Sequence, residues 1–194
     1  MTGVEFLRLC REARVRTGAG RFRHCVSVAR TADKLAARYG ASSCKARVAG
    51  MLHDVARGWS GEQLLAYAQA HGIAAGDAER AAPVLLHAPI GADIARREFG
   101  VEDAETLGAI RRHTIAGPRM TTLEKILYVA DTIEPTRTYP GREALEAAAA
   151  ESLDRALLAC VKESMQYLTS RGISIAPETA ELYDELVKHD GRQA

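Results

Sequence analysis

The sequence has no segment that would direct the chain into or across a membrane. Its N-terminus lacks the basic start and the apolar run of a secretory signal peptide. No stretch approaches the roughly 18 consecutive apolar residues of a transmembrane helix. The formal net charge is only +1 at pH 7, so the composition indicates neither a nucleic-acid nor a membrane partner. We therefore expect a cytoplasmic protein.

The cysteines are too scattered to build a thiolate zinc site. The chain has four of them, Cys10, Cys25, Cys44 and Cys160, and none forms a C-x-x-C pair. This spacing excludes a zinc finger or a zinc ribbon. Disulfides are not expected in a chain without an export signal. We predict four free thiols, some of them buried.

Alternating apolar and polar residues, which mark half-buried strands, are scarce, and there is no internal repeat or low-complexity linker. Ala, Leu, Arg and Glu dominate, and all four are strong helix formers. A chain of 194 residues is long enough to bury the core of one ordinary domain. We predict an all-α fold and a single domain over residues 1–194, with an N-terminal helix at about 3–15, a core at about 20–135 and C-terminal helices at about 142–190.

Apolar spacing and capping signals place the individual helices. Two capping boxes, Ser60 to Gln63 and Thr121 to Glu124, open helices. Pro89 suits a first helical turn. The predicted helices cover about 3–15, 21–39, 44–56, 60–71, 89–99, 103–113, 121–133 and 144–168, and a last one starts at 177.

Six residues with metal-binding side chains occupy apolar helical surroundings. They are His24, His53, Asp54, His87, His113 and Asp131. Any one of them could be an ordinary core histidine or a capping acid, but carboxylates are almost never fully buried unless they are paired or metal-bound. Imidazole nitrogens and carboxylate oxygens suit iron, manganese, cobalt, nickel or zinc. The set therefore predicts a site for one or two divalent metal ions.

The adjacent pair His53 and Asp54 raises a geometric question. Neighbouring residues in a helix point in different directions. One metal ion can take both side chains only where the helix ends or is distorted. The two oxygens of the carboxylate could instead bridge two metal ions. Both arrangements remain open at this point.

The order of these six residues resembles that of the HD superfamily of metal-dependent phosphohydrolases. Longer strings are similar to the YqeK family, which comprises bacterial symmetrical dinucleoside tetraphosphate hydrolases. The resemblance extends from about Arg21 to Tyr183. The strings that carry it are Arg21-Phe-Arg-His24, Met51-Leu-His-Asp-Val-Ala-Arg57, Leu85-Leu-His-Ala-Pro-Ile-Gly-Ala92, Arg112-His-Thr114, Leu123-Glu-Lys-Ile-Leu-Tyr-Val-Ala-Asp131, Ile133-Glu-Pro-Thr-Arg137 and Tyr139-Pro-Gly141.

The resemblance implies an HD-type helical bundle with an iron site between its core helices. It implies the cleavage of diadenosine tetraphosphate (Ap4A) into two molecules of ADP by a metal-activated water, with a small-molecule nucleotide as the partner and a homodimer left open. The matched positions give His24, His53, Asp54 and Asp131 as primary metal ligands. They give His87 and His113 as ligands of a second metal or as phosphate contacts, and Arg21, Arg57 and Arg137 as phosphate-binding cations, with Asp54 and Arg57 as catalytic residues.

Three positions depart from the family pattern without removing a ligand. Ala88 stands where glycine is usual, Arg57 where lysine is common, and Thr114-Ile-Ala-Gly117 where the family tends to read Thr-Thr-Gly. Two alternatives stay open: an HD-type nucleotidase or cyclic-dinucleotide phosphodiesterase, and a nucleotide-sensing or partner-binding protein without turnover. We assign no role to His71 and His189. Thr114 could donate to a phosphate or be an ordinary helix-end residue, and Lys125 and Glu134 could orient ligands, although we prefer to interpret them as helix-surface residues.

Overall fold

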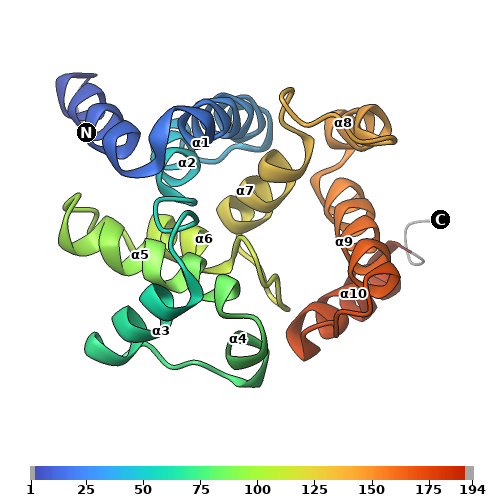
Figure 1. Cartoon of the computed structure of the whole chain (residues 1–194). Helices are drawn as coiled ribbons and strands as arrows, with labels where there is room; N and C mark the ends of the chain where they lie inside the picture. The colour runs from blue at the N-terminus through green and yellow to red at the C-terminus, as the bar shows by residue number, and fades with distance from the viewer. Residues whose placement is uncertain (1–2, 191–194) are drawn as a thin grey trace.

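The computed structural model describes residues 3–190, and every regular element within that range is helical (Figure 1). This confirms the predicted all-α fold class. The elements are α1 (Gly3–Tyr39), α2 (Ser43–Leu52), α3 (Gly61–Ala70), α4 (Asp77–Ala81), the 3₁₀ helix η1 (Pro83–Leu86), α5 (His87–Arg97), α6 (Ala104–Arg112), α7 (Thr122–Ile133), α8 (Arg142–Glu151), α9 (Leu153–Ser170) and α10 (Pro177–Asp190).

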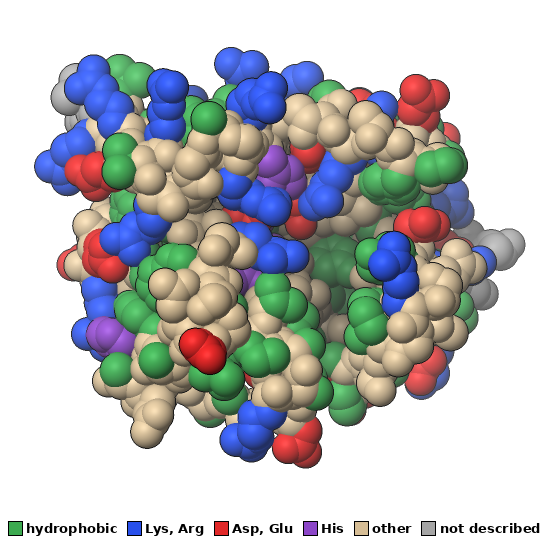
Figure 2. Space-filling view, in the orientation of Figure 1, with side chains coloured by type: hydrophobic (Ala, Val, Ile, Leu, Met, Phe, Trp, Pro, Cys, Tyr) green, Lys and Arg blue, Asp and Glu red, His purple; other side chains and the backbone are tan. Residues whose placement is uncertain are grey.

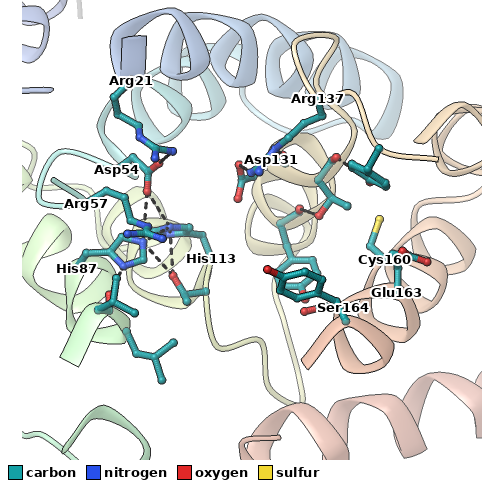
Figure 3. Close-up of a pocket in the computed structure, with 17 residues that line it drawn as sticks. Arg21, Asp54, Arg57, His87, His113, Asp131, Arg137, Cys160, Glu163 and Ser164 are labelled. Atoms are coloured by element: carbon teal, nitrogen blue, oxygen red, sulfur yellow. Dashed lines mark hydrogen bonds and ion pairs between the residues drawn. The ribbon is translucent and has the colours of Figure 1, made fainter. Parts of the chain in front are cut away.

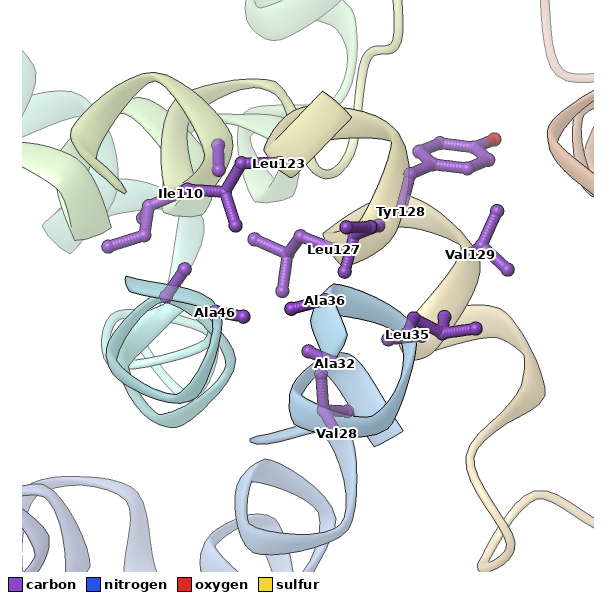
Figure 4. Close-up of a cluster of buried hydrophobic side chains, with 14 of the residues drawn as sticks. Val28, Ala32, Leu35, Ala36, Ala46, Ile110, Leu123, Leu127, Tyr128 and Val129 are labelled. Atoms are coloured by element: carbon purple, nitrogen blue, oxygen red, sulfur yellow. The ribbon is translucent and has the colours of Figure 1, made fainter. Parts of the chain in front are cut away.

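Helix α7 lies at the centre of the arrangement. In Figure 1, α1 and α2 pass along one side of α7, α3 to α5 lie below them, and α8 to α10 form the opposite side, near the C-terminus. The main hydrophobic core fills the space between α1, α2, α6 and α7 (Figure 4). On α1 the fully buried residues Val28, Ala32 and Ala36 follow one another at steps of four, so they form one stripe along the helix.

A close backbone contact joins α1 to α2. A Cβ atom at Gly50 would lie 2.6 Å from the Cα atom of Ala29, which is far inside van der Waals contact. Only glycine permits the two helices to approach this closely. The contact holds the segment around His24 beside the segment that ends at His53.

Two of the predicted helices have the wrong boundaries. The helix expected at 44–56 ends at Leu52, and the residues that follow form turns. The single helix expected at 144–168 is two helices, because Ser152 is extended (φ −150°, ψ 129°) and its side chain accepts a hydrogen bond from the Arg155 backbone. The two helices expected at 3–15 and 21–39 are confirmed as two helical segments of α1, separated by a break at Gly18, whose backbone is not helical (φ 73°, ψ 166°).

A second, smaller core lies below the turns that follow α2. Val55 and Ala56 from these turns pack with Leu64 of α3 and with Ile90 and Ile94 of α5. This packing fixes the turn that carries His53 and Asp54. All four cysteines are free, as predicted. No helix within residues 3–190 has both the length and the apolar character that a membrane crossing requires.

Candidate metal centre

The six predicted metal ligands lie together, although they come from five different elements. His24 is on α1, His53 and Asp54 follow α2, His87 begins α5, His113 follows α6, and Asp131 is on α7. Because α2 ends at Leu52, His53 is its C-cap and Asp54 lies in the turn beyond it. The end of the helix explains how two adjacent side chains can reach the same centre.

One side of the centre is formed by two histidines and two aspartates. His24 Nε2 lies 3.0 Å from Asp131 Oδ1 and 3.2 Å from His53 Nε2. Asp54 Oδ2 lies 3.6 Å from His24 Nε2 and 3.5 Å from His53 Nε2. The ligand atoms of His24, His53 and Asp131 all lie within 4.8 Å of one another, a spacing that a single metal ion can bridge.

The other oxygen of Asp54 faces a second pair of histidines. Asp54 Oδ1 lies 3.2 Å from His87 Nε2 and 3.7 Å from His113 Nε2, and these two nitrogens are 3.1 Å apart (Figure 3). Thr114 Oγ1 is 3.3 Å from His87 Nε2 and 3.2 Å from His113 Nε2. Asp54 thus stands between two groups of imidazoles, with one carboxylate oxygen facing each group.

The four histidines share one hydrogen-bonding arrangement, in which Nδ1 faces an oxygen atom outside the centre and Nε2 faces the centre. His53 Nδ1 donates to the Gly50 carbonyl at 2.8 Å and His113 Nδ1 to the Ile110 carbonyl at 2.7 Å, while His87 Nδ1 donates to the Val84 carbonyl. His24 Nδ1 donates to the Glu134 carboxylate at 3.0 Å. With the proton held on Nδ1, each Nε2 presents its lone pair to the centre. Neutral imidazoles with fixed outer hydrogen bonds are the form that binds metal ions.

Glu134 corrects the sequence interpretation. We expected a plain helix-surface residue, but its side chain has no exposed area. Its carboxylate accepts hydrogen bonds from His24, from the Thr136 hydroxyl at 2.6 Å and from the Thr136 backbone at 2.7 Å. Burial by itself would raise the pKa of Glu134, but hydrogen bonds from Ser27, Thr136 and His24 lower it. Lys125, by contrast, pairs with Asp154 at 2.7 Å, away from the centre.

Burial and charge set the protonation of the ligands. Desolvation lowers the pKa of His53 to about 4. Burial would raise the pKa of Asp54, but the imidazoles of His53, His113 and His87 beside it hold it far below the usual range. The pKa of Asp131 is likewise lowered, chiefly by the adjacent His24, against the effect of burial. Two ionised carboxylates and a neutral His53 are therefore ready to bind a cation at neutral pH.

Three arginines surround the open side of the centre. Arg21 Nη1 donates to Asp54 Oδ2 at 2.9 Å and Arg137 Nη2 to Asp131 Oδ1 at 2.6 Å. Arg57 lies over His87 and His113 in Figure 3, and within residues 3–190 it has no acidic partner. Figure 2 shows Lys and Arg side chains gathered at a hollow in the surface, with a histidine visible between them. Cations so placed attract an anionic ligand to this centre.

The hollow is a cleft of about 600 Å³ that continues away from the centre. Asp54, His87, His113 and Asp131 lie on one wall, whereas His24 and His53 are buried behind it. The opposite wall comes from α7, the loop after it and α9, through Tyr128, Thr132, Tyr139, Cys160, Glu163, Ser164 and Tyr167. The cleft is as large as a typical small-molecule site.

The model of the HD domain family matches residues 21–136. The chain belongs to the HD domain family. A symmetrical bis(5'-nucleosyl)-tetraphosphatase from Bacillus subtilis is 40% identical over 167 residues, which cover 86% of this chain and 89% of the relative. A protein of the same name from Halalkalibacterium halodurans is 35% identical over 167 residues, which again cover 86% of this chain and 89% of the relative.

A solved structure supports the same family. It is the crystal structure of a protein from Clostridium acetobutylicum described as a predicted HD superfamily hydrolase involved in NAD metabolism. It is 33% identical, has a TM-score of 0.91, and the match covers 95% of this chain and 97% of that one. The HD family resemblance inferred from the sequence is thus confirmed, whereas the roles of the individual residues stay predictions.

Part of the cleft lies outside the HD match, which ends at residue 136. Tyr139, Cys160, Glu163, Ser164 and Tyr167 all come after that point. Sequence reasoning assigned none of them a role in the site, although Tyr139 belongs to one of the strings that carry the family resemblance, because none is part of a ligand motif. The only signal available was their spacing: Cys160, Glu163, Ser164 and Tyr167 recur at helical steps, so they share one side of α9.

Proposed function

We propose that this HD domain protein hydrolyses dinucleoside tetraphosphates symmetrically, converting Ap4A and water into two ADP. The observation that carries the proposal is the position of Asp54, between two pairs of inward-facing imidazoles and beside Arg21. The names of the relatives from Bacillus subtilis and Halalkalibacterium halodurans support the same substrate. The bond that forms joins the water oxygen to an inner phosphorus, and the bond that breaks is the central phosphoric anhydride.

The donor set fits iron or another divalent transition metal. It consists of imidazole nitrogens and carboxylate oxygens without thiolates, which suits iron, manganese, cobalt, nickel or zinc. We assign His24, His53, Asp54 and Asp131 to one ion, and Asp54, His87 and His113 to a second ion or to phosphate contacts. A metal held there would lower the pKa of water towards about 7 and polarise a phosphoryl oxygen.

The arginines bind and orient the phosphate chain. Arg21 and Arg137 are fixed by Asp54 and Asp131, so their guanidinium groups stand at the cleft before the substrate arrives. Among residues 3–190 Arg57 has no competing acid, so it is free to form a bidentate contact with a phosphate. Thr114 Oγ1 lies beside both histidines of the second pair, where it can donate a hydrogen bond to a phosphate oxygen.

Product identification tests the proposal. Protein purified without oxygen is analysed for metal and then incubated with Ap4A, and the products are separated. The proposal expects two ADP per Ap4A. ATP plus AMP would contradict symmetric cleavage. Turnover of only a nucleoside monophosphate or a cyclic dinucleotide would show that the substrate class is wrong.

A variant tests the role of the centre. Asp54→Ala should abolish both hydrolysis and most of the bound metal, because it removes the carboxylate shared by the two groups. Asp184→Ala is the control, since this aspartate is exposed on α10 and has no ion pair in the described chain. Activity of the Asp54 variant equal to that of the control would refute the metal mechanism.

A further inference from the structure

A second cleft of about 1120 Å³ borders the first. It runs along α5 and is lined by the loop after α3, the residues that follow α6 and the start of α10. Leu85 and Thr114 line both clefts, so the two share a wall. Of the residues with a proposed role in hydrolysis, Thr114 alone lines this second cleft.

The shared wall consists of the two segments that carry the second pair of histidines. His87 lines the first cleft, while its neighbour Ala88 lines the second. His113 lines the first cleft, while Arg112 lines the second. The candidate metal centre therefore opens into the first cleft, directly beside the wall that the two clefts share.

Five arginines line the second cleft, namely Arg96, Arg97, Arg111, Arg112 and Arg119. Arg97 is held by Asp93 at 2.8 Å, and Arg112 by Glu124 at 2.9 Å. Arg96, Arg111 and Arg119 are exposed, and none of their guanidinium groups has an acidic partner among residues 3–190. These three cations are available to a ligand.

The acids on the same walls are mostly engaged. Asp93 is bound to Arg97, and the Glu79 carboxylate accepts from the Gly76 backbone at 3.0 Å. Asp77 lies 3.7 Å from Arg80, and Glu178 opens α10. Arg111 belongs to the end of α6 that leads into His113, so its charge is close in sequence to the centre.

We propose that the second cleft binds the second nucleoside diphosphate half of the substrate. The inference rests on the proposed function. Symmetric cleavage breaks the phosphate chain at its middle, so two equal halves must extend from the reacting bond in different directions. The first cleft receives one half between the centre and α9. The other half crosses the wall at Leu85 and Thr114 and lies along α5, whose 11 residues span about 16 Å.

Two of the three free arginines, Arg96 and Arg111, have separate roles in this arrangement. Arg111 contacts the phosphates, because it stands beside the segment that carries His113. Arg96 lies near the far end of α5, where its planar guanidinium group can stack on the base. Stacking of this kind tolerates different bases and fits a site for a general dinucleoside tetraphosphate.

Calorimetric titration with ADP tests the second site independently of turnover. Wild-type metal-loaded protein should bind two ADP per chain, and the Arg96→Ala/Arg111→Ala variant only one. Arg30→Ala is the control, since Arg30 is exposed on α1, outside both clefts, and should leave two sites. One ADP on the wild type, or two on the double variant, would overturn the inference.

Kinetics with Ap4A give a second readout. Loss of two charged contacts should raise KM for Ap4A about tenfold or more, with kcat little changed because the metal centre is untouched. An unchanged KM would overturn the inference and leave the proposed function standing. If the wild type produced no ADP from Ap4A, the proposed function would fail, while the ADP stoichiometry would still decide whether the second site exists.

Discussion

Replacing Glu134 with glutamine should weaken metal binding on the His24 side of the centre. The carboxylate accepts three hydrogen bonds from His24 and Thr136 and is fully buried. Glutamine has nearly the same shape, but only one of its two terminal atoms can accept. If its oxygen keeps the Thr136 backbone hydrogen bond, its NH₂ group faces His24 Nδ1.

That substitution changes the form of His24. An NH₂ group can only donate to Nδ1, so the imidazole proton must move to Nε2, the atom that lies 3.0 Å from Asp131. A protonated Nε2 has no lone pair for a metal. Loss of an outer hydrogen-bond partner of this kind reduces metal affinity about 10- to 100-fold, or about 1.4–2.8 kcal/mol.

Metal affinity is measured by competition with a chelator, and bound metal is counted after equilibration at limiting metal. Glu181→Gln is the matched control, since Glu181 is exposed on α10 and has no partner in the described chain. The fold of both variants is compared by circular dichroism and urea unfolding without metal. A Glu134→Gln affinity within twofold of the control would refute the reasoning.

Three further perturbations test the packing, the cleft and the buried histidine. Gly50→Ala should destabilise the protein by about 1–3 kcal/mol and lower its Tm, because the new methyl group would lie 2.6 Å from Ala29. Gly20→Ala is the control, since a methyl group there meets nothing within 4 Å and should not lower Tm. Arg57→Ala should reduce kcat/KM for Ap4A about 10- to 100-fold, and Arg57→Lys should restore part of it. A kcat/KM of Arg57→Ala equal to that of the wild type would show that Arg57 does not bind the substrate. The pKa of His53 is lowered to about 4, below the value near 6.5 of an unfolded histidine, so its contribution to the stability of the metal-free protein is lost as pH falls from about 6.5 towards 4. The urea midpoint should therefore fall over this range, and less so in His53→Gln; identical profiles would contradict the assignment.

The sequence was sufficient to bring the six candidate metal ligands together because they conflict with their surroundings. Asp54 stands within an apolar helical pattern, and a buried carboxylate needs a partner. The order of His24, His53 and Asp131 then matched a known family. What the sequence left open was whether His53 and Asp54 could face one centre, and the end of α2 at Leu52 answered that question.

Glu134 escaped the same reasoning for a physical reason. Its position next to Pro135, at the end of α7, resembles that of an ordinary exposed helix end. Burial there depends on α1, whose His24 and Ser27 reach across to it. Sequence spacing within one helix carries no information about a neighbour that is 110 residues away in the chain. Long-range hydrogen bonds of this kind are the part of a metal site that the sequence pattern alone does not reveal.

The break between α8 and α9 at Ser152 determines where α9 lies. The Ala-rich run before it and the apolar pattern after it both favour helix, so the pattern predicted one long helix. In the structure the chain changes direction at Ser152, α8 and α9 pack against each other, and α9 also packs against α7. This places Glu163 and Tyr167 on the wall opposite Asp54. Most of the candidate ligands therefore lie on or beside α1, α2, α5 and α6, whereas α9 forms much of the opposite wall of the first cleft, and α7 contributes to both.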